Sequence, residues 1–492
     1  MKAVVDEGKS IMLDSIPPHI KSLLIIGAGP AGYITAIRLA QRGFSVTLVE
    51  STHVGGTCLN WGCIPSKALI HASNDYYKIK SKSLASLGIQ VGELALDWAT
   101  LSAHLEQDVQ QLRNGIEARL KRLKVNLVKG NARFISPTSV EVQDAEGKSK
   151  VLQADAFVIA TGAKTLVPQV FQGLDPRFSL SVKEIFSIPE LPKRLGIVGA
   201  GVIGLELAQA FQRLGVEVHV LDRLSGILPQ YDAKLVAILQ DKLKKEGISF
   251  HFNADITTAV VDEAQNHVTL KITSLLNPEE QQTLEVERLL IAPGRRANTQ
   301  GLRLENAGVD LHPQSGGVII NDALQSNQPH IFAIGDVTHG HPQLAHVASH
   351  HGIMLAETLA GKQNGLDALT QIPAVVYTQP ELARVGLSLE EATSKGYTAK
   401  VTRLPFAALG RATIDGVSDG QALIVVDDAT GAILGAEILS PYADALISQM
   451  LQAIELGATV EDVALSVHPH PSLSEAWLEV AERHLGHGIH ID

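Results

Sequence analysis

The only two cysteines of the 492-residue chain, Cys58 and Cys63, lie close together in the stretch GGTCLNWGCIPSK, residues 55–67. Four residues separate them, which is close enough for a disulfide if the chain forms a helical turn there. A dithiol/disulfide couple carries two electrons and reacts through a thiolate, whose pKa is lowered by the dipole at a helix start. The spacing alone leaves open a structural disulfide or two idle core cysteines.

A glycine-rich segment with G-x-G-x-x-G spacing precedes the cysteines. Its glycines are Gly27, Gly29 and Gly32. The residues around it predict a strand over 23–26, a helix over 33–41 and a second strand over 45–49 that ends at Glu50. Such glycines let the backbone approach a pyrophosphate, the helix N-terminus faces its charge, and the acid accepts from a ribose hydroxyl. The segment therefore predicts a dinucleotide site.

The same unit recurs later in the chain. Its glycines are Gly199, Gly201 and Gly204, between a predicted strand over 195–198 and a strand that ends at Asp222. From first glycine to acid the spacing is 50 − 27 = 23 residues in one copy and 222 − 199 = 23 in the other. Two dinucleotide sites and a redox-active cysteine pair imply a relay of nicotinamide, flavin and disulfide. The cysteine motif begins five residues after the acid of the first copy, which favours the flavin in the first site.

The composition disfavours nucleic-acid and membrane partners. The formal charge is 41 − 52 = −11, and there is no run of 18 or more apolar residues. Residues 1–22 lack the apolar core of a signal peptide and contain three acids and no arginine, unlike a transit peptide. Two cysteines in so long a chain do not look like a secreted disulfide framework. We therefore expect a cytoplasmic enzyme.

The chain length predicts about three domains. Between the two glycine units, residues 85–124 read as mainly helical and residues 125–159 as strand-rich. Past residue 371 the pattern changes to alternating strands and two long helical stretches, which predicts a separate C-terminal domain.

Several motifs, in family order, resemble those of the dihydrolipoamide dehydrogenases, which belong to the flavin disulfide oxidoreductases. They are GGTCLNWGCIPSK, the two glycine units, ATG at 160–162, GRRANT at 294–299, AIGD at 333–336, YTQPELARVG at 377–386 and HPHPSLSEA at 468–476. The resemblance runs from about residue 22 to the C-terminus and implies an α/β fold. It consists of two Rossmann-like dinucleotide-binding domains, for FAD and NAD, and a C-terminal α+β dimerisation domain.

The resemblance also implies the domain boundaries and the partners. The FAD domain would begin with residues 1–163, the NAD domain cover 164–292, a central domain completing the FAD site cover 293–370, and the dimerisation domain cover 371–492. The implied activity is oxidation of dihydrolipoamide with reduction of NAD by a homodimer. Its macromolecular partner would be the lipoyl domains of a 2-oxoacid dehydrogenase complex or a similar lipoylated protein, with no nucleic acid, membrane or metal.

The matching motifs imply roles for individual residues. Cys58 would be the interchange thiol that meets the lipoyl sulfur, and Cys63 would lie against the flavin. Lys67 would lie near the flavin ring and pair with Glu206. The FAD contacts implied by position are Gly27, Gly29, Gly32, Glu50, Gly56, Thr57, Lys67, Gly130, Thr161, Gly162, Asp336, Gln343, Leu344, Ala345 and His346. The NAD contacts are Gly199, Gly201, Gly204, Glu206, Asp222 and Gly294.

By the same resemblance, His470 is a base supplied to the partner chain's site, and Glu475 orients its ring. Pro471 biases His470 toward an extended backbone before a helix that should begin near Leu473. Glu475 has a second explanation, because the stretch 472–475, SLSE, is also a capping box in which it only satisfies a helix-start N–H.

Other features leave alternatives open. Trp61 is bulkier than the small aliphatic residue usual in this motif, and either narrows the site or packs around the flavin. A histidine cluster invites a metal hypothesis, but its spacings match no compact site; it comprises His339, His341, His346, His350 and His351. Arg223, directly after Asp222, weakens the preference for NAD because it could meet a 2′-phosphate.

Four competing functions remain. Glutathione-type reductases that use NADPH tend to carry alanine and arginine where Gly204 and Asp222 stand here. Mercuric reductase needs an additional cysteine pair, and soluble transhydrogenase lacks one member of the pair that is present here. A flavin-bearing redox sensor or scaffold without turnover is the alternative from another class, but a sensor needs no base such as His470.

Overall fold

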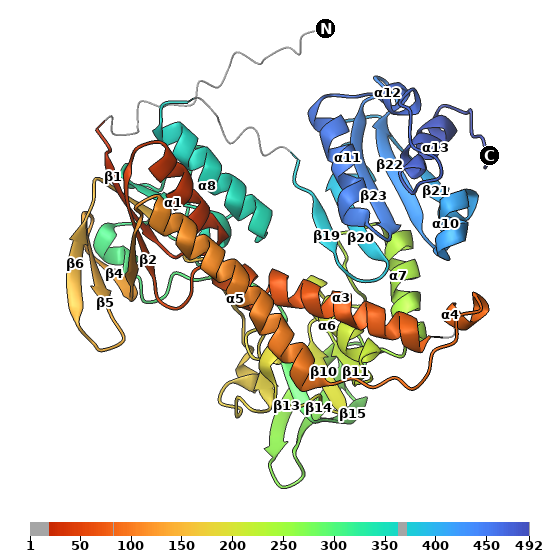
Figure 1. Ribbon diagram of the computed structural model, residues 1–492, viewed down its shortest axis with the longest axis horizontal. Coiled ribbons are helices and arrows are strands. Elements are labelled where there is room, and N and C mark those ends of the chain that lie inside the picture. The colour runs from red at the N-terminus through yellow and green to blue at the C-terminus, as the bar shows by residue number, and fades with distance from the viewer. Residues whose placement is uncertain (1–18, 82, 363–370, 492) are drawn as a thin grey trace.

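The structure is a computed structural model that describes residues 19–81, 83–362 and 371–491. This part of the chain is organised around three five-stranded sheets; Figure 1 shows most of the first in red to orange, the second in yellow to green, and the third in cyan to blue. The sequence predicts that residues 1–22 contain no targeting signal. Residues 1–18 of this stretch lie outside the described residues. Across the described ranges, no helix is long and apolar enough to cross a membrane.

The first sheet is parallel and carries the first glycine unit. In spatial order its strands are β18 (Ile331–Ala333), β7 (Ala156–Ile159), β1 (Ser22–Ile26), β2 (Ser45–Glu50) and β3 (Asn126–Lys129). Two helices, α1 (Pro30–Gln41) and α8 (Ala345–Leu359), cover one face. The other face packs on an antiparallel sheet of β4 (Asn131–Ser136), β5 (Ser139–Gln143) and β6 (Ser149–Gln153). In sequence, strand β18 follows the second unit. The first sheet is therefore completed by a strand that is distant in sequence from its other strands.

The second sheet repeats this arrangement. Its strands are β12 (Ser249–His251), β11 (Glu217–Leu221), β10 (Arg194–Val198), β16 (Arg288–Ile291) and β9 (Ser179–Leu180). It packs with α6 (Val202–Arg213) and α7 (Ala233–Lys245) and has its own antiparallel sheet of β13 (Ala254–Asp262), β14 (His267–Ser274) and β15 (Gln281–Val286). The structure thus contains the duplicated unit that the equal glycine-to-acid spacing predicts.

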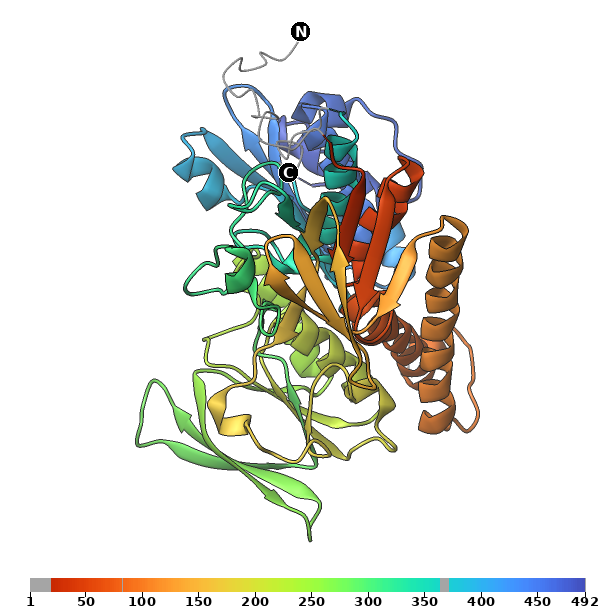
Figure 2. The same ribbon diagram turned by 90° about the vertical axis from the view of Figure 1, so that its left-hand side faces the viewer.

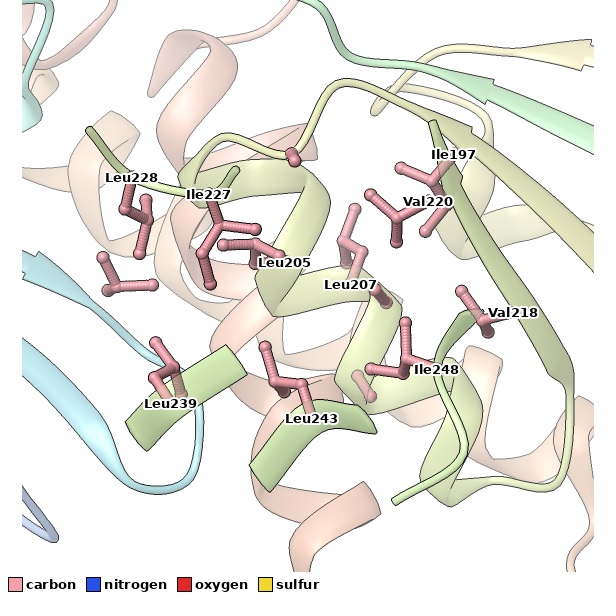
Figure 3. Close-up of a cluster of buried hydrophobic side chains, with 14 of the residues drawn as sticks. Ile197, Leu205, Leu207, Val218, Val220, Ile227, Leu228, Leu239, Leu243 and Ile248 are labelled. Carbon is pink, nitrogen blue, oxygen red and sulfur yellow. The ribbon is translucent and has the colours of Figure 1, made fainter. Parts of the chain in front are cut away.

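An apolar cluster fixes α6 on the second sheet. Figure 3 shows side chains from α6, α7 and the neighbouring strands pointing toward one another. Leu205 and Leu207 of α6 lie in this cluster with exposed fractions of 0% and 1%. Burial of such side chains stabilises the packing by about 1.5–3 kcal/mol each. One face of α6 therefore packs against the sheet and helix of the second unit.

The cysteine motif leads into a helical arm. It consists of α2 (Gly56–Trp61), α3 (Cys63–Lys80), α4 (Ser83–Ser86) and α5 (Trp98–Arg122). The mainly helical segment expected over 85–124 is present as the end of α4 and as α5, with a break over residues 87–97, which form neither helix nor strand. Gly88, at φ +79°, disfavours a helix there, and Asp97 accepts a hydrogen bond from the Thr100 N–H at 3.1 Å to cap α5.

The C-terminal unit is built on an antiparallel sheet. Its strands are β19 (Ala374–Val376), β20 (Glu381–Gly386), β23 (Ile433–Ser440), β22 (Gln421–Asp427) and β21 (Ala399–Pro405). Its helices are α9 (Leu389–Ser394), α10 (Gly410–Asp415), α11 (Ala443–Glu455), α12 (Val460–Ala464) and α13 (Glu475–His484). A small ribbon of β8 (Ala163–Thr165) and β17 (Arg295–Ala297) connects the first two units. The predicted boundary near residue 370 falls within the undescribed residues 363–370.

Candidate active site

The cysteine pair lies at the junction of α2 and α3. Thr57 and Cys58 are in α2, and Cys63 is the first residue of α3, with Gly62 between the two helices. Both cysteines are free thiols of intermediate exposure. Because Cys63 begins an 18-residue helix, the positive end of the helix dipole favours its thiolate. The helical turn that the spacing requires is present.

The two thiols differ in acidity. The pKa of the Cys63 thiol is lowered to about 7, because Cys58 donates a hydrogen bond to it and the Lys67 ammonium lies near it. The pKa of the Cys58 thiol is raised by the same hydrogen bond and by burial. In the reduced pair the negative charge therefore resides on Cys63, which becomes increasingly ionised as the pH rises through about 7.

Lys67 is held by a buried carboxylate. Its Nζ lies 2.7 Å from Oε2 of Glu206, whose side chain is 4% exposed. Lys67 follows Cys63 by one helical turn on α3, whereas Glu206 belongs to α6 of the second unit. The predicted ion pair is present, and it joins the cysteine helix to the second nucleotide-binding unit.

The glycines of the first unit have distinct roles. A Cβ on Gly27 would lie 2.4 Å from the Ala160 carbonyl oxygen, and a Cβ on Gly32 would lie 1.8 Å from the Gly27 carbonyl oxygen. These two positions therefore require glycine for the turn and for helix packing. Gly29 has more room, since its nearest neighbour would be the Cα of Gly56 at 3.8 Å. The start of α2 thus lies against the glycine turn, where a pyrophosphate would bind.

The second unit repeats this division. A Cβ on Gly199 would lie 2.4 Å from the Ala292 carbonyl oxygen, and one on Gly204 would lie 2.0 Å from the Gly199 carbonyl oxygen. A Cβ on Gly201 would meet no atom within 4 Å. In both units the middle glycine leaves space at the start of a 12-residue helix. The residues therefore fit two dinucleotides, with a pyrophosphate at each helix N-terminus.

The two strand-end acids are held in matching ways. Glu50 accepts a hydrogen bond from the Ala28 N–H at 2.7 Å, and Asp222 accepts one from the Ala200 N–H at 2.6 Å. Each amide belongs to the residue between the first two glycines. The other oxygen of each acid accepts from the loop that follows, from the Thr52 N–H at 2.8 Å for Glu50 and from the Leu224 N–H at 2.8 Å for Asp222. Each acid thus lies beside its glycine turn, where a ribose hydroxyl would be a further donor.

Asp336 has a partner that the sequence did not reveal. It lies in the short helical turn Gly335–Val337 after β18, and Arg295 of β17 donates a hydrogen bond to its Oδ2 at 3.0 Å. Burial raises the pKa of Asp336, and the Arg295 charge opposes that rise. Arg295 also donates to the Ala163 carbonyl at 2.9 Å, so it fixes the ribbon between the units. Its position in GRRANT was the available signal.

Other predicted contacts lie at turns. Gly130, predicted for the FAD site, has φ +149° and follows β3, and Gly294, predicted for the NAD site, has φ +150° and precedes β17. The Thr161 hydroxyl donates to the Asn298 carbonyl at 2.7 Å, and the Asn298 N–H donates to the Gly162 carbonyl at 2.9 Å. Asn298, for which no role was predicted, therefore holds the turn at residues 160–162 through these two backbone hydrogen bonds.

The stretch 343–346 forms the start of α8. Gln343 donates a hydrogen bond to the Asp336 carbonyl at 3.4 Å, and Leu344 and Ala345 are the N-cap and first residue of the helix. Nε2 of His346 lies 2.9 Å from the Pro373 carbonyl oxygen. The stretch is thus next to Asp336, while the His346 ring is bound to the C-terminal unit.

Glu475 contacts both His470 and the backbone of Ser472, although α13 begins at Glu475 itself with Ser474 as its N-cap, so no capping box forms. Its Oε1 lies 2.8 Å from Nδ1 of His470, and its Oε2 accepts from the Ser472 N–H at 2.7 Å. Burial would raise the pKa of Glu475, but these two hydrogen bonds outweigh it and lower the pKa. The bond to Nδ1 orients the imidazole and leaves Nε2 for proton transfer. The helix starts at Glu475 rather than at Leu473.

His470 and Glu475, which we call the dyad, do not lie next to the cysteines of their own chain. The His470 side chain is 79% exposed. Figure 1 shows α13 in the upper part of the C-terminal unit, away from the start of α3. A side chain this exposed and this far from Cys58 of its own chain is available to another molecule.

Trp61 packs between two parts of the chain. Its ring centroid lies 6.1 Å from that of His53, and Nζ of Lys183 lies 4.9 Å from its ring centre. Trp61 thus contacts the loop after β9. Neither alternative considered for it is decided by these contacts.

The histidines do not converge on a metal site. His312 and His339 stack at 3.6 Å, and His341 packs edge-on against His351 at 4.9 Å. Burial lowers the pKa of His351 to about 3, and its Nδ1 accepts from the Gly335 N–H at 3.2 Å. In the part of the chain that is described, no group of three or more His, Cys, Asp or Glu side chains could hold a metal ion.

Two family models match the chain. The description of the first is pyridine nucleotide-disulphide oxidoreductase, and it matches residues 21–352. The second describes the dimerisation domain of the same family and matches residues 372–481.

Similar proteins cover nearly the whole chain. A dihydrolipoyl dehydrogenase from Chlamydia pneumoniae is 38% identical over 470 residues, which are 95% of this chain and 97% of that protein. The crystal structure of LpdA from Mycobacterium tuberculosis has a TM-score of 0.86 at 26% identity and covers 94% of this chain and 99% of its own. The HOCl-induced flavoprotein disulfide reductase RclA from Escherichia coli, in a Cu(II) complex, has a TM-score of 0.83 at 28% identity, with 94% and 99% covered.

Proposed function

Because the chain belongs to the pyridine nucleotide-disulphide oxidoreductase family, we propose that it oxidises dihydrolipoamide to lipoamide and reduces NAD. The observation that carries this proposal is the asymmetric thiol pair. Cys63 has a lowered pKa and lies beside the Lys67–Glu206 ion pair, which links the pair to the second nucleotide unit. FAD bound in the first unit supplies the two-electron carrier between the dithiol and NAD.

The interchange step follows from the thiol chemistry. His470 of one chain takes a proton from a substrate thiol, and the resulting thiolate attacks the sulfur of Cys58 in the oxidised pair. The Cys58–Cys63 bond breaks, and Cys63 leaves as the thiolate that its lowered pKa favours. The second substrate thiol then attacks the substrate sulfur that is bonded to Cys58, and its proton passes to the departing Cys58 sulfur. The new sulfur–sulfur bond closes the disulfide of lipoamide. The two electrons remain on the dithiol for transfer to NAD.

The exposed dyad supports a homodimer in which each chain supplies the other's base. The chain carries the dimerisation domain of its family, and His470 at 79% exposure requires a second chain to meet a cysteine pair. We further propose that the domains have the boundaries predicted from the sequence, because the two parallel sheets and the antiparallel sheet fall in the corresponding ranges. Lipoyl domains as partners and a cytoplasmic location stay predictions.

An assay of substrates tests this function. Purified protein with NAD should form NADH from dihydrolipoamide at a rate far above its rate with other dithiols. Robust NADH-driven reduction of a different disulfide, with negligible activity on dihydrolipoamide, would replace the proposal by a flavin disulfide reductase of other specificity. An absence of turnover with every disulfide would favour a redox sensor.

We expect NAD to be preferred over NADP by at least about tenfold in kcat/KM, equivalent to about 1.4 kcal/mol. Asp222 would repel a 2′-phosphate by like charge while accepting from ribose hydroxyls. Arg223 is directed elsewhere, because its Nη1 forms an ion pair with Asp255 at 2.8 Å. Steady-state kinetics with both nucleotides measures the ratio. Similar efficiencies would mean that Arg223, rather than Asp222, determines the choice.

A further inference from the structure

A polar face of α6 is buried between two other parts of the chain. Glu206, Gln209 and Arg213 are spaced i, i+3 and i+7 and so share one helix face. Their exposed fractions are 3%, 3% and 5%. Buried polar side chains are costly unless they are hydrogen-bonded, so these three must have partners.

On one side the partners lie on α3. Lys67 pairs with Glu206 at 2.7 Å, and two helical turns later Arg213 donates a hydrogen bond to Asn74. The spacings are 74 − 67 = 7 and 213 − 206 = 7 residues, so the helices run parallel and in register. The Arg213 guanidinium also lies 4.6 Å from the ring centre of Tyr77.

On the other side the partner is the loop between β19 and β20 of the C-terminal sheet, residues 377–379, which we call the strap. The Tyr377 N–H donates to Oε1 of Glu206 at 2.9 Å. The Gln379 N–H donates to Oε1 of Gln209 at 2.7 Å, and Nε2 of Gln209 donates to the Gln379 carbonyl at 2.9 Å. The Gln209 side chain therefore forms hydrogen bonds with both the N–H and the carbonyl of Gln379, as the backbone of a neighbouring strand would.

Tyr377 of the strap also contacts the Lys67 ammonium. Nζ of Lys67 lies 4.4 Å from the ring centre of Tyr377, within the range of a cation–π interaction. The ammonium is thus held between the Glu206 carboxylate and the Tyr377 ring. The contact with Tyr377 depends on where the strap lies on α6, and Gln209 anchors the strap one helical turn from Glu206.

We propose that the strap, anchored by Gln209, is the device that holds Lys67 beside Cys63. Gln209 and Tyr377 are accordingly positioning residues, which act through Lys67 and need touch neither substrate nor cofactor. The strap lies in the dimerisation part of the chain, which thereby acts on the dithiol of its own chain. The inference rests on the proposed function only in that Cys63 is the thiol that must ionise.

Alkylation of Cys63 tests the proposal without substrate turnover. In a Cys58→Ser background Cys63 is the only thiol of the chain, so the pH dependence of its reaction with iodoacetamide reports its pKa. The groups that act on it there are Lys67 from its own helix, Glu206 from α6, Tyr377 from the strap and the residue at position 58. Adding Gln209→Met should raise the midpoint by about 0.5–1 unit, which is a roughly three- to tenfold lower ratio of thiolate to thiol at a given pH.

Gln212→Met is the matched control. Gln212 lies on the same helix, and its side chain accepts from the Val218 N–H at 3.1 Å within the second unit. Its removal should leave the alkylation midpoint unchanged. Equal midpoints for the Gln209 and Gln212 variants would overturn the proposal, whether or not the protein turns over lipoamide.

A second pair of variants covers the case in which Gln209→Met does not fold. Tyr377→Leu removes the ring over Lys67 but keeps the backbone N–H that bonds Glu206, and it should also raise the midpoint. Tyr377→Phe keeps the ring and should restore the parent value. A Leu variant that matches the Phe variant would show that the strap does not position Lys67.

Discussion

Replacing Cys58 with serine is expected to abolish lipoamide turnover while producing a long-wavelength absorption in the resting protein. The rate should fall on the order of 10⁴-fold or more, the scale seen when a covalent nucleophile is removed. Cys63 would then be a permanent thiolate against the flavin, because no partner remains to oxidise it. The Lys67 ammonium, which lowers the pKa of Cys63, is still present in this variant, so the absorption should be strong at alkaline pH and fade as the pH falls. Visible spectra and an assay measure both effects.

Cys63→Ser is the matched comparison and should lose both the turnover and the absorption. Burial raises the pKa of Cys58, and Cys58 does not begin a long helix as Cys63 does, so it should not replace Cys63 as the thiolate against the flavin. If the absorption instead appears in the Cys63 variant, the assignment of the two thiols is reversed.

His470→Gln is expected to slow lipoamide turnover by about 10²–10⁴-fold, the usual contribution of a general base. Reduction of the flavin by NADH should be largely intact, because the imidazole acts only on the substrate thiols. Stopped-flow measurement of each half-reaction separates the two. His468→Gln is the control, since His468 lies two residues earlier and is not part of the Glu475 pair. A His470 variant that slows both halves alike would point to a structural role.

Mixed dimers establish which chain supplies the base. A dimer of one Cys58→Ser chain and one His470→Gln chain has one site with neither intact residue and one site with both, if the base comes from the partner. Such a dimer should regain one of its two active sites. If each chain used its own His470, the mixed dimer would be as inactive as its parents.

The parts of the fold predicted from sequence are those encoded by local spacing. The 23-residue interval from Gly27 to Glu50 recurs from Gly199 to Asp222, and each interval specifies a strand, turn, helix and strand with little help from the rest of the chain. The Lys67–Glu206 pair was predicted from the resemblance alone, because the two residues are 139 positions apart.

The parts that escaped prediction depend on tertiary contacts. Arg295 reaches Asp336 across 41 residues, and Gln209 meets the strap across 170. Nothing in helical periodicity marks the buried polar face of α6, since polar residues at this spacing usually indicate a solvated surface. The apolar spacing behind the predicted helix lies within α5, so it carried no information about the break over residues 87–97.

Anaerobic titration with dihydrolipoamide tests most directly whether electrons pass from a dithiol through the cysteine pair to NAD. The purified protein should be yellow and release FAD on denaturation. One equivalent of dihydrolipoamide per FAD should produce the long-wavelength absorption, and one equivalent of NAD should then remove it and yield one NADH. A protein that carries FAD but shows no spectral change with dihydrolipoamide, while NADH still reduces it, would contradict lipoamide as the substrate. A folded protein that cannot take up FAD would contradict the relay itself.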